Sequence, residues 1–193
     1  MIIKDWKKDI FTIPNILSLF RMALIPVYIS IYLNATENIH YYIAAAILAV
    51  SCLTDLIDGK IARNFNMIST VGKILDPLAD KATQFTLILC LAIRHSVLWF
   101  IVFLFVIKEG FQLIAGFLTL RKGKMLTGAL LSGKICTTIL FVSLILLVLL
   151  PQLSSKMVGY IAGIDAVFML ISFADYIRTY YKHTPMIQNL EDE

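Results

Sequence analysis

The chain contains a succession of long apolar stretches, and each is about the length of a membrane-spanning helix. A helix needs roughly 20 mostly apolar residues to cross the hydrocarbon core of a bilayer. Hydrophobic residues make up 59% of this chain, against roughly 45–50% in soluble domains. We therefore predict an all-α membrane protein with six transmembrane helices. These helices are expected at residues 14–33, 41–64, 70–93, 97–120, 127–150 and 158–180.

The N-terminal segment MIIKDWKKDIF has the pattern of a helix that lies in the membrane interface. Ile3, Trp6 and Ile10 share one helical face, and lysines occupy the others. This pattern is typical of interfacial helices. We predict a single domain over residues 1–193, with an interfacial helix at 1–11, a six-helix bundle at 12–182 and a cytoplasmic tail at 183–193.

The positive charges gather at the ends of the predicted helices. Cytoplasmic loops of membrane proteins carry an excess of lysine and arginine, and here that excess puts both termini in the cytoplasm. The net charge of +4 then favours anionic lipid headgroups as partners, and not nucleic acid.

Four aspartates stand where the second and third predicted helices approach each other, in the stretch DLIDGKIARNFNMISTVGKILDPLAD at residues 55–80. A helix turns about 100° per residue, so Asp55 and Asp58 share one face, and Asp76 and Asp80 share a face of the next helix. The two acidic faces can meet near the cytoplasmic end of both helices.

Carboxylates at membrane depth each cost at least about 2.5–3.5 kcal/mol on insertion scales, and they also repel one another. Oxygen ligands without histidine or cysteine favour hard ions such as Mg²⁺ or Mn²⁺. Four carboxylates can hold two such ions about 3.5–4 Å apart. Gly59 and Gly72 lie beside the acids and let a bulky ligand approach the backbone. The alternatives are a set of structural ion pairs and an ion pathway, as in a divalent-cation transporter.

The same stretch resembles the D-x2-D-G-x2-A-R-x8-G-x3-D-x3-D signature of the CDP-alcohol phosphatidyltransferase family at every fixed position. The segment TIPNILSLFRMALIP at residues 12–26 is similar to the start of bacterial phosphatidylglycerophosphate synthases and cardiolipin synthases. The resemblance implies a homodimeric, Mg²⁺- or Mn²⁺-dependent enzyme of the bacterial cell membrane, with its site open to the cytoplasm. Such an enzyme moves a phosphatidyl group from CDP-diacylglycerol to an alcohol and releases CMP.

The resemblance also implies roles for individual residues. Asp55 and Asp76 would contact both metal ions, and Asp58 would bind the first. Asp80 would bind the second ion and accept the proton of the attacking hydroxyl. The residues expected to contact the CDP-lipid are Asn15, Ser18, Gly59, Arg63, Ser69 and Gly72.

Three cations are candidates for binding the acceptor. Lys134 lies in SGKICT, which resembles the G-K-x-K-T segment of the phosphatidylglycerophosphate synthases. Lys108 precedes Glu109, and because adjacent helical residues point in different directions, we expect the two to have separate partners. Arg21 is expected either to neutralise the acidic cluster or to bind a phosphate.

The chain departs from the synthase pattern at two positions, where Gly116 and Cys136 replace expected cations. Glycerol 3-phosphate is the predicted acceptor. The missing cations keep two alternatives open, a cardiolipin synthase and a phosphatidylinositol-type synthase. Asp165, deep in the last predicted helix, needs a partner that the sequence does not identify.

Overall fold

The computed structural model describes residues 12–64, 72–121 and 131–183 of the chain. Every regular element in these ranges is helical, which confirms the all-α prediction. The elements are α2 (Ile13–Leu33), α3 (Asn38–Asn64), α4 (Gly72–Arg94), the short 3-10 helix η1 (Ser96–Leu98), α5 (Trp99–Arg121), α6 (Leu131–Leu149) and α7 (Ser155–His183). The side chains of residues 55–64 and of a few other helix-end residues lie outside this description.

Within the described ranges, the helices begin and end within three residues of the predicted spans. The start of the fifth predicted span, at 127–130, and the interfacial helix predicted at 1–11 lie outside the described residues. Thr12 is the N-cap of α2, with a proline in the first turn. A proline is tolerated there because the first turn has no intrahelical acceptor for its missing N–H.

Four of the described helices are long and apolar enough to cross a membrane: Asn15–Leu33, Ser96–Gly116, Leu131–Leu149 and Ser155–Tyr181. The chain is thus an integral membrane protein. The described apolar part of α3 is shorter, at Asn38–Thr54, and α4 carries Asp76, Asp80 and Lys81 in its first half. Because of these charges, α4 is less apolar than those four helices, and the six-span count stays a prediction.

The chain divides into two compact units. The first contains α2, α3 and α4 as far as Leu91, together with Ile145–Gln152. The second contains Ala92–Leu144 and the chain from Leu153 onward. Organisation as one domain stays a prediction.

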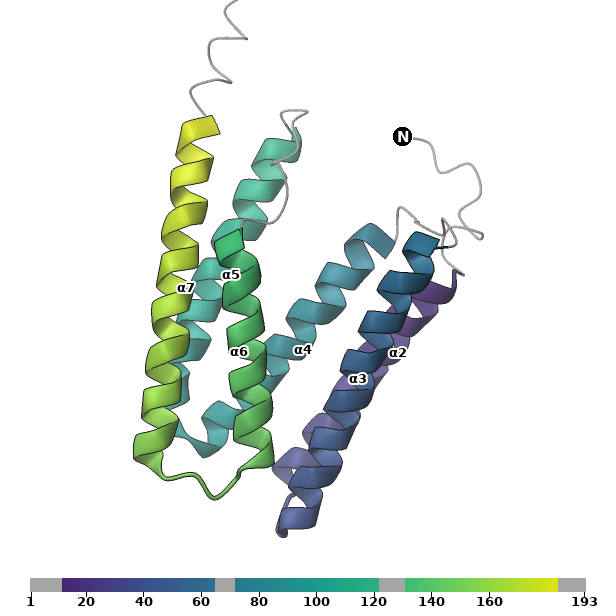
Figure 1. Cartoon of the computed structure of the whole chain (residues 1–193), viewed down its shortest axis with the longest axis vertical. Helices are drawn as coiled ribbons and strands as arrows, with labels where there is room; N and C mark the ends of the chain where they lie inside the picture. Colours follow the sequence, from purple (N-terminus) through teal and green to yellow (C-terminus); the bar gives the residue numbers. More distant parts are fainter. Residues whose placement is uncertain (1–11, 65–71, 122–130, 184–193) are drawn as a thin grey trace, which may run out of the picture. The chain divides into compact units, whose positions relative to one another are not determined.

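In the first unit, α2 and α3 form a helical hairpin and lie side by side (Figure 1). Three buried tyrosines pack together near the turn of this hairpin. The rings of Tyr28 and Tyr32 stack at a centroid distance of 5.5 Å, and Tyr41 of α3 meets Tyr32 edge-on at 5.6 Å. The Tyr41 hydroxyl also donates to the carbonyl oxygen of Ala35 in the turn. Aromatic pairs of this geometry stabilise by about 0.5–1.5 kcal/mol beyond their buried area.

In the second unit, α5 packs against α7. Phe111 of α5 lies edge-on to Phe173 of α7, at a centroid distance of 5.4 Å, and to Tyr180 at 6.0 Å. Nε2 of the next residue, Gln112, donates to the Tyr176 hydroxyl across 2.8 Å. On α6, Gly133 faces the Tyr176 ring so closely that a Cβ would lie 3.2 Å from Cε2. A side chain here would require the Tyr176 ring or α6 to shift by a few tenths of an ångström.

Candidate active site

Two of the four predicted metal ligands, Asp76 and Asp80, lie one turn apart on α4 in the first unit. Both are partly exposed, and the side chain of Asp80 keeps 45% of its surface accessible. The carboxylates are thus held by the protein on one side and open on another. Gly72, at the first residue of α4, is buried.

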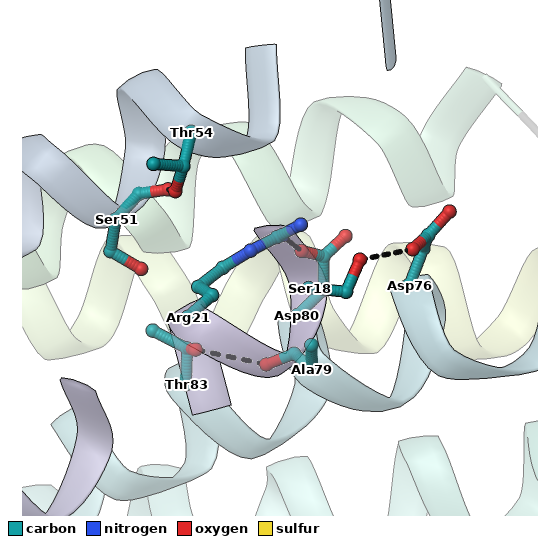
Figure 2. A network of polar contacts seen from close by, with 8 residues as sticks. All are labelled: Ser18, Arg21, Ser51, Thr54, Asp76, Ala79, Asp80 and Thr83. Carbon is teal, nitrogen blue, oxygen red and sulfur yellow. Dashed lines mark hydrogen bonds and ion pairs between the residues drawn. The ribbon is translucent and has the colours of Figure 1, made fainter. Parts of the chain in front are cut away.

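The buried partners of these carboxylates come from α2. Figure 2 shows Ser18 and Arg21 reaching from α2 toward α4. The Ser18 hydroxyl donates to Oδ1 of Asp76, and the Arg21 guanidinium donates to Oδ1 of Asp80 and forms an ion pair with it. Ser18 is fully buried and Arg21 is 2% exposed.

A polar stripe on α2 makes this arrangement possible. Asn15, Ser18 and Arg21 are spaced three residues apart on an otherwise apolar helix, and all three are buried. Residues three apart lie on the same side of a helix. A polar stripe cannot face lipid without a large free-energy cost, so this side of α2 turns inward.

Arg21 was expected to have one of two partners, the acidic cluster or a phosphate. The structure shows the first, through the ion pair with Asp80. Arg21 also borders a cavity of about 10 Å³, whose other walls include Leu24, Tyr28 and Leu87. Such a volume holds about one water molecule and is too small for a substrate. Phosphate binding by Arg21 stays a prediction.

The remaining ligands lie where side chains are not described. Asp55, Asp58, Gly59 and Arg63 belong to α3, so their helical spacing is as predicted. Ser69 lies outside the described residues altogether. In residues 12–54, 72–121 and 131–183, no three His, Cys, Asp or Glu side chains come together as a metal site. The meeting of the two acidic faces therefore stays a prediction.

The donor set nevertheless suits a hard divalent cation. Asp76 and Asp80 offer carboxylate oxygens, which are the ligands that Mg²⁺ and Mn²⁺ prefer. The guanidinium of Arg21 on Asp80 shows that this carboxylate is placed to receive positive charge. Both carboxylates are also open enough for a cation to reach them.

The other two candidate acceptor residues, Lys108 and Lys134, belong to the second unit. Lys108 and Glu109 are buried, and Nζ of Lys108 donates to Oε1 of Glu109 across 2.6 Å. The expectation of separate partners was therefore wrong for this contact. Adjacent Cβ atoms diverge on a helix, but the long lysine side chain folds back to its neighbour. Burial favours that pairing because an unpaired charge there would cost more.

Lys134 is exposed near the start of α6. Its carbonyl oxygen accepts hydrogen bonds from the hydroxyls of Thr137 and Thr138. Cys136, at a position where the synthases carry a cation, is buried. Lys134 is thus accessible to a ligand, and its role in acceptor binding stays a prediction.

The partner of Asp165 could not be inferred from the sequence. The structure identifies it as Ser143 of α6, whose hydroxyl donates to Oδ1 of Asp165 across 2.9 Å. Asp165 is 2% exposed. A serine in an apolar stretch gives no sequence signal, because its significance depends on which helix it faces.

The fold and site define a class: a helical integral membrane protein with carboxylates held at one end of a helix by buried polar donors. Comparison with known proteins identifies the family. The chain matches the family model described as CDP-alcohol phosphatidyltransferase over residues 11–174. It belongs to that family of membrane transferases, which act in phospholipid biosynthesis and generally use divalent metal ions.

Several relatives match most of the chain, and two of them are described here. A protein of Streptomyces coelicolor named cardiolipin synthase (CMP-forming) is 31% identical over 89% of this chain and 78% of its own length. A protein of Aquifex aeolicus named CDP-diacylglycerol–glycerol-3-phosphate 3-phosphatidyltransferase is 30% identical over 88% of this chain and 96% of its own length.

A third similarity is confined to part of a longer protein. A fusion protein of Schizosaccharomyces pombe, named cardiolipin synthase (CMP-forming)/mitochondrial hydrolase, is 38% identical over 90 residues, which are 47% of this chain and 14% of that protein. The relatives agree on the family, but their names refer to two different reactions within it.

Proposed function

We propose that the protein transfers a phosphatidyl group from CDP-diacylglycerol to glycerol 3-phosphate and releases CMP. The observation that carries this proposal is the pair of α4 carboxylates, Asp76 and Asp80, held from behind by Ser18 and Arg21. Family membership supports the CDP-linked donor. Because this is a family of transferases, membership also removes the alternative of a cation transporter.

Asp55, Asp58, Asp76 and Asp80 are the proposed ligands of two Mg²⁺ or Mn²⁺ ions. When bound, the ions neutralise the pyrophosphate and the CMP leaving group. Asp80 is the proposed acceptor of the proton from the attacking hydroxyl. Its accessible side chain supports this role, because a general base must come within hydrogen-bond reach of its substrate.

The CDP-lipid is proposed to contact the polar residues around these acids. They are Asn15, Ser18, Gly59, Arg63, Ser69 and Gly72. Asn15 and Ser18 are buried, so little of either side chain is accessible to a ligand in this arrangement. We further propose a homodimer in a bacterial cell membrane, with the site and both termini facing the cytoplasm.

The acceptor is the part of the reaction on which the relatives differ. Lys134 is exposed and available to a phosphate. The charge of Lys108 is already matched by Glu109, and Gly116 and Cys136 carry none. This deficit favours a second candidate, cardiolipin synthesis, in which the acceptor is a phosphatidylglycerol with one phosphodiester charge.

One assay tests the reaction and separates the two acceptors. Purified protein is incubated with CDP-diacylglycerol, Mg²⁺ or Mn²⁺ and one acceptor at a time, and CMP release is measured. Faster release with glycerol 3-phosphate than with phosphatidylglycerol supports the first candidate, and the reverse order supports the second. No release above background with glycerol 3-phosphate, phosphatidylglycerol or inositol would refute the proposed function.

Asp80→Asn is expected to abolish release, since the amide cannot accept the proton. Asp175→Asn in α7 is the matched control, because it makes the same chemical change in the other unit. It should leave the rate unchanged.

A further inference from the structure

Arg21 is built into the protein core, while its ion-pair partner faces outward. The side chain of Arg21 is 3% exposed and that of Asp80 is 45% exposed. A guanidinium keeps its charge at any physiological pH. The open carboxylate is thus anchored from behind by a permanent positive charge.

The surroundings of Arg21 keep it there. Apolar side chains such as Leu24, Ile25 and Leu87 border its cavity, and the volume left is about 10 Å³. On this side the arginine is closely surrounded by apolar neighbours. The contact through which Arg21 acts on the site is its ion pair with Asp80.

The neighbouring carboxylate has a neutral counterpart to this contact. Ser18, three residues before Arg21 and fully buried, donates its hydroxyl to Asp76. Each acid of α4 thus has its own donor on α2, one charged and one uncharged. The pair allows the effect of charge to be separated from the effect of position.

We propose that Arg21 is a positioning residue with two opposing effects: it fixes the carboxylate of Asp80 for turnover, and its charge weakens the binding of divalent cations to the same carboxylates. Ser18 positions Asp76 without the charge effect. The proposal rests on the proposed function, in which Asp76 and Asp80 hold metal ions.

The two effects have opposite signs in a charge-removing variant. Arg21→Gln removes a unit charge close to the cation, so Mn²⁺ should bind tighter by roughly tenfold or more. The same change frees the Asp80 side chain, and a displacement of about 1 Å at a reacting group costs up to about 100-fold in turnover. A merely structural residue would weaken both binding and turnover.

The experiment compares Mn²⁺ binding with steady-state kinetics on purified, folded protein. Mn²⁺ affinity is measured by electron paramagnetic resonance of the free ion, without CDP-lipid or acceptor. CMP release then gives kcat and KM for each substrate. Arg21→Gln should lower the Kd for Mn²⁺ and lower kcat, with little change in the acceptor KM.

Two further variants sharpen the test. Arg21→Lys keeps the charge but loses the planar fork of donors, so its Mn²⁺ Kd should stay within about threefold of wild type while kcat falls. Arg94→Gln, at the far end of α4, is the control for net charge. It lies about 20 Å from Asp80 along the helix, beyond the Debye length at physiological salt, and should change neither value.

A Kd for Mn²⁺ that is unchanged or weaker in Arg21→Gln would overturn the proposal. An absence of Mn²⁺ binding in both wild type and Arg21→Gln would overturn it as well. If the unchanged Kd is accompanied by a raised acceptor KM, Arg21 belongs to the acceptor site instead. If Arg21→Gln does not fold, Arg21→Lys decides, and a wild-type kcat in that variant counts against a positioning role.

The binding measurement needs no substrate, so its failure is distinct from that of the proposed function. Wild-type protein that releases no CMP, but whose Mn²⁺ affinity still rises in Arg21→Gln, would refute the reaction and leave the role of Arg21 at the site.

Discussion

Breaking the buried pair of Lys108 and Glu109 is expected to destabilise the protein strongly. The two side chains are 5% and 10% exposed, and their charged atoms lie 2.6 Å apart. Removing one member of a buried pair leaves an uncompensated charge and costs about 3–5 kcal/mol. For a chain of this length, each kcal/mol lowers the unfolding midpoint by roughly 2–4 °C. Lys108→Met and Glu109→Leu should therefore each lower it by about 6–20 °C.

The double variant distinguishes a structural pair from two independent charges. Apolar residues of similar volume often replace a buried ion pair at little cost, so the double variant should unfold closer to wild type than either single variant. Thermal unfolding in detergent, followed by tryptophan fluorescence, provides the measurement. Lys134→Met is the matched control, because that lysine is exposed and surface substitutions usually change stability by less than about 0.5 kcal/mol.

Two results would refute this reasoning. One is a single variant that unfolds within 2 °C of wild type, by the scale of about 2–4 °C per kcal/mol. The other is a double variant whose loss equals the sum of the single losses, because independent sites add in this way. The double variant also tests the acceptor role, since an unchanged KM for glycerol 3-phosphate would remove Lys108 from the acceptor site.

Two further predictions concern single contacts, and a third concerns the proposed metal dependence. Gly133→Ala should destabilise the protein by about 1–3 kcal/mol, since its Cβ would lie 3.2 Å from Tyr176 Cε2, whereas Gly110→Ala, with nothing within 4 Å, should not; thermal unfolding compares the two. Ser143→Ala should cost about 1–3 kcal/mol by removing the hydroxyl that donates to buried Asp165, and a midpoint equal to that of wild type would show that this contact contributes nothing. Removing divalent ions with a chelator should stop CMP release, and Mg²⁺ or Mn²⁺ should restore it; activity that survives exhaustive chelation would contradict the metal-dependent reaction.

The sequence alone was sufficient to locate the helices that the structure describes. Apolar stretches of about 20 residues have one stable arrangement in a bilayer, because backbone N–H and C=O groups must be paired within the segment. Predicted and observed helix ends therefore agree within three residues where the structure describes them. The aspartate spacing likewise predicted that Asp76 and Asp80 lie one turn apart, because this depends only on helical geometry.

Partners between helices were not predictable in the same way. They depend on how each helix is rotated about its axis. A helix that is apolar on nearly every side has too few polar residues for its sequence to determine that rotation. Arg21 therefore had two expected partners until the structure showed the contact with Asp80, and the Ser143 contact with Asp165 was not foreseen. For Lys108, a rule based on Cβ directions failed because a flexible side chain can reach its neighbour.

The polar stripe of α2 resolves that rotation for the first unit. In a bilayer the apolar faces of helices gain little by packing against one another, because lipid tails are equally apolar. Buried Ser18 and Arg21 both reach α4, where they contact the carboxylates of Asp76 and Asp80. A rotation of α2 by one residue, about 100°, would turn the guanidinium away from Asp80. The carboxylates proposed for the chemistry thus also fix the orientation of α2, so substituting them should disturb both activity and helix packing. Asparagine is the substitution that best separates these effects, because its side-chain oxygen still accepts a hydrogen bond from α2.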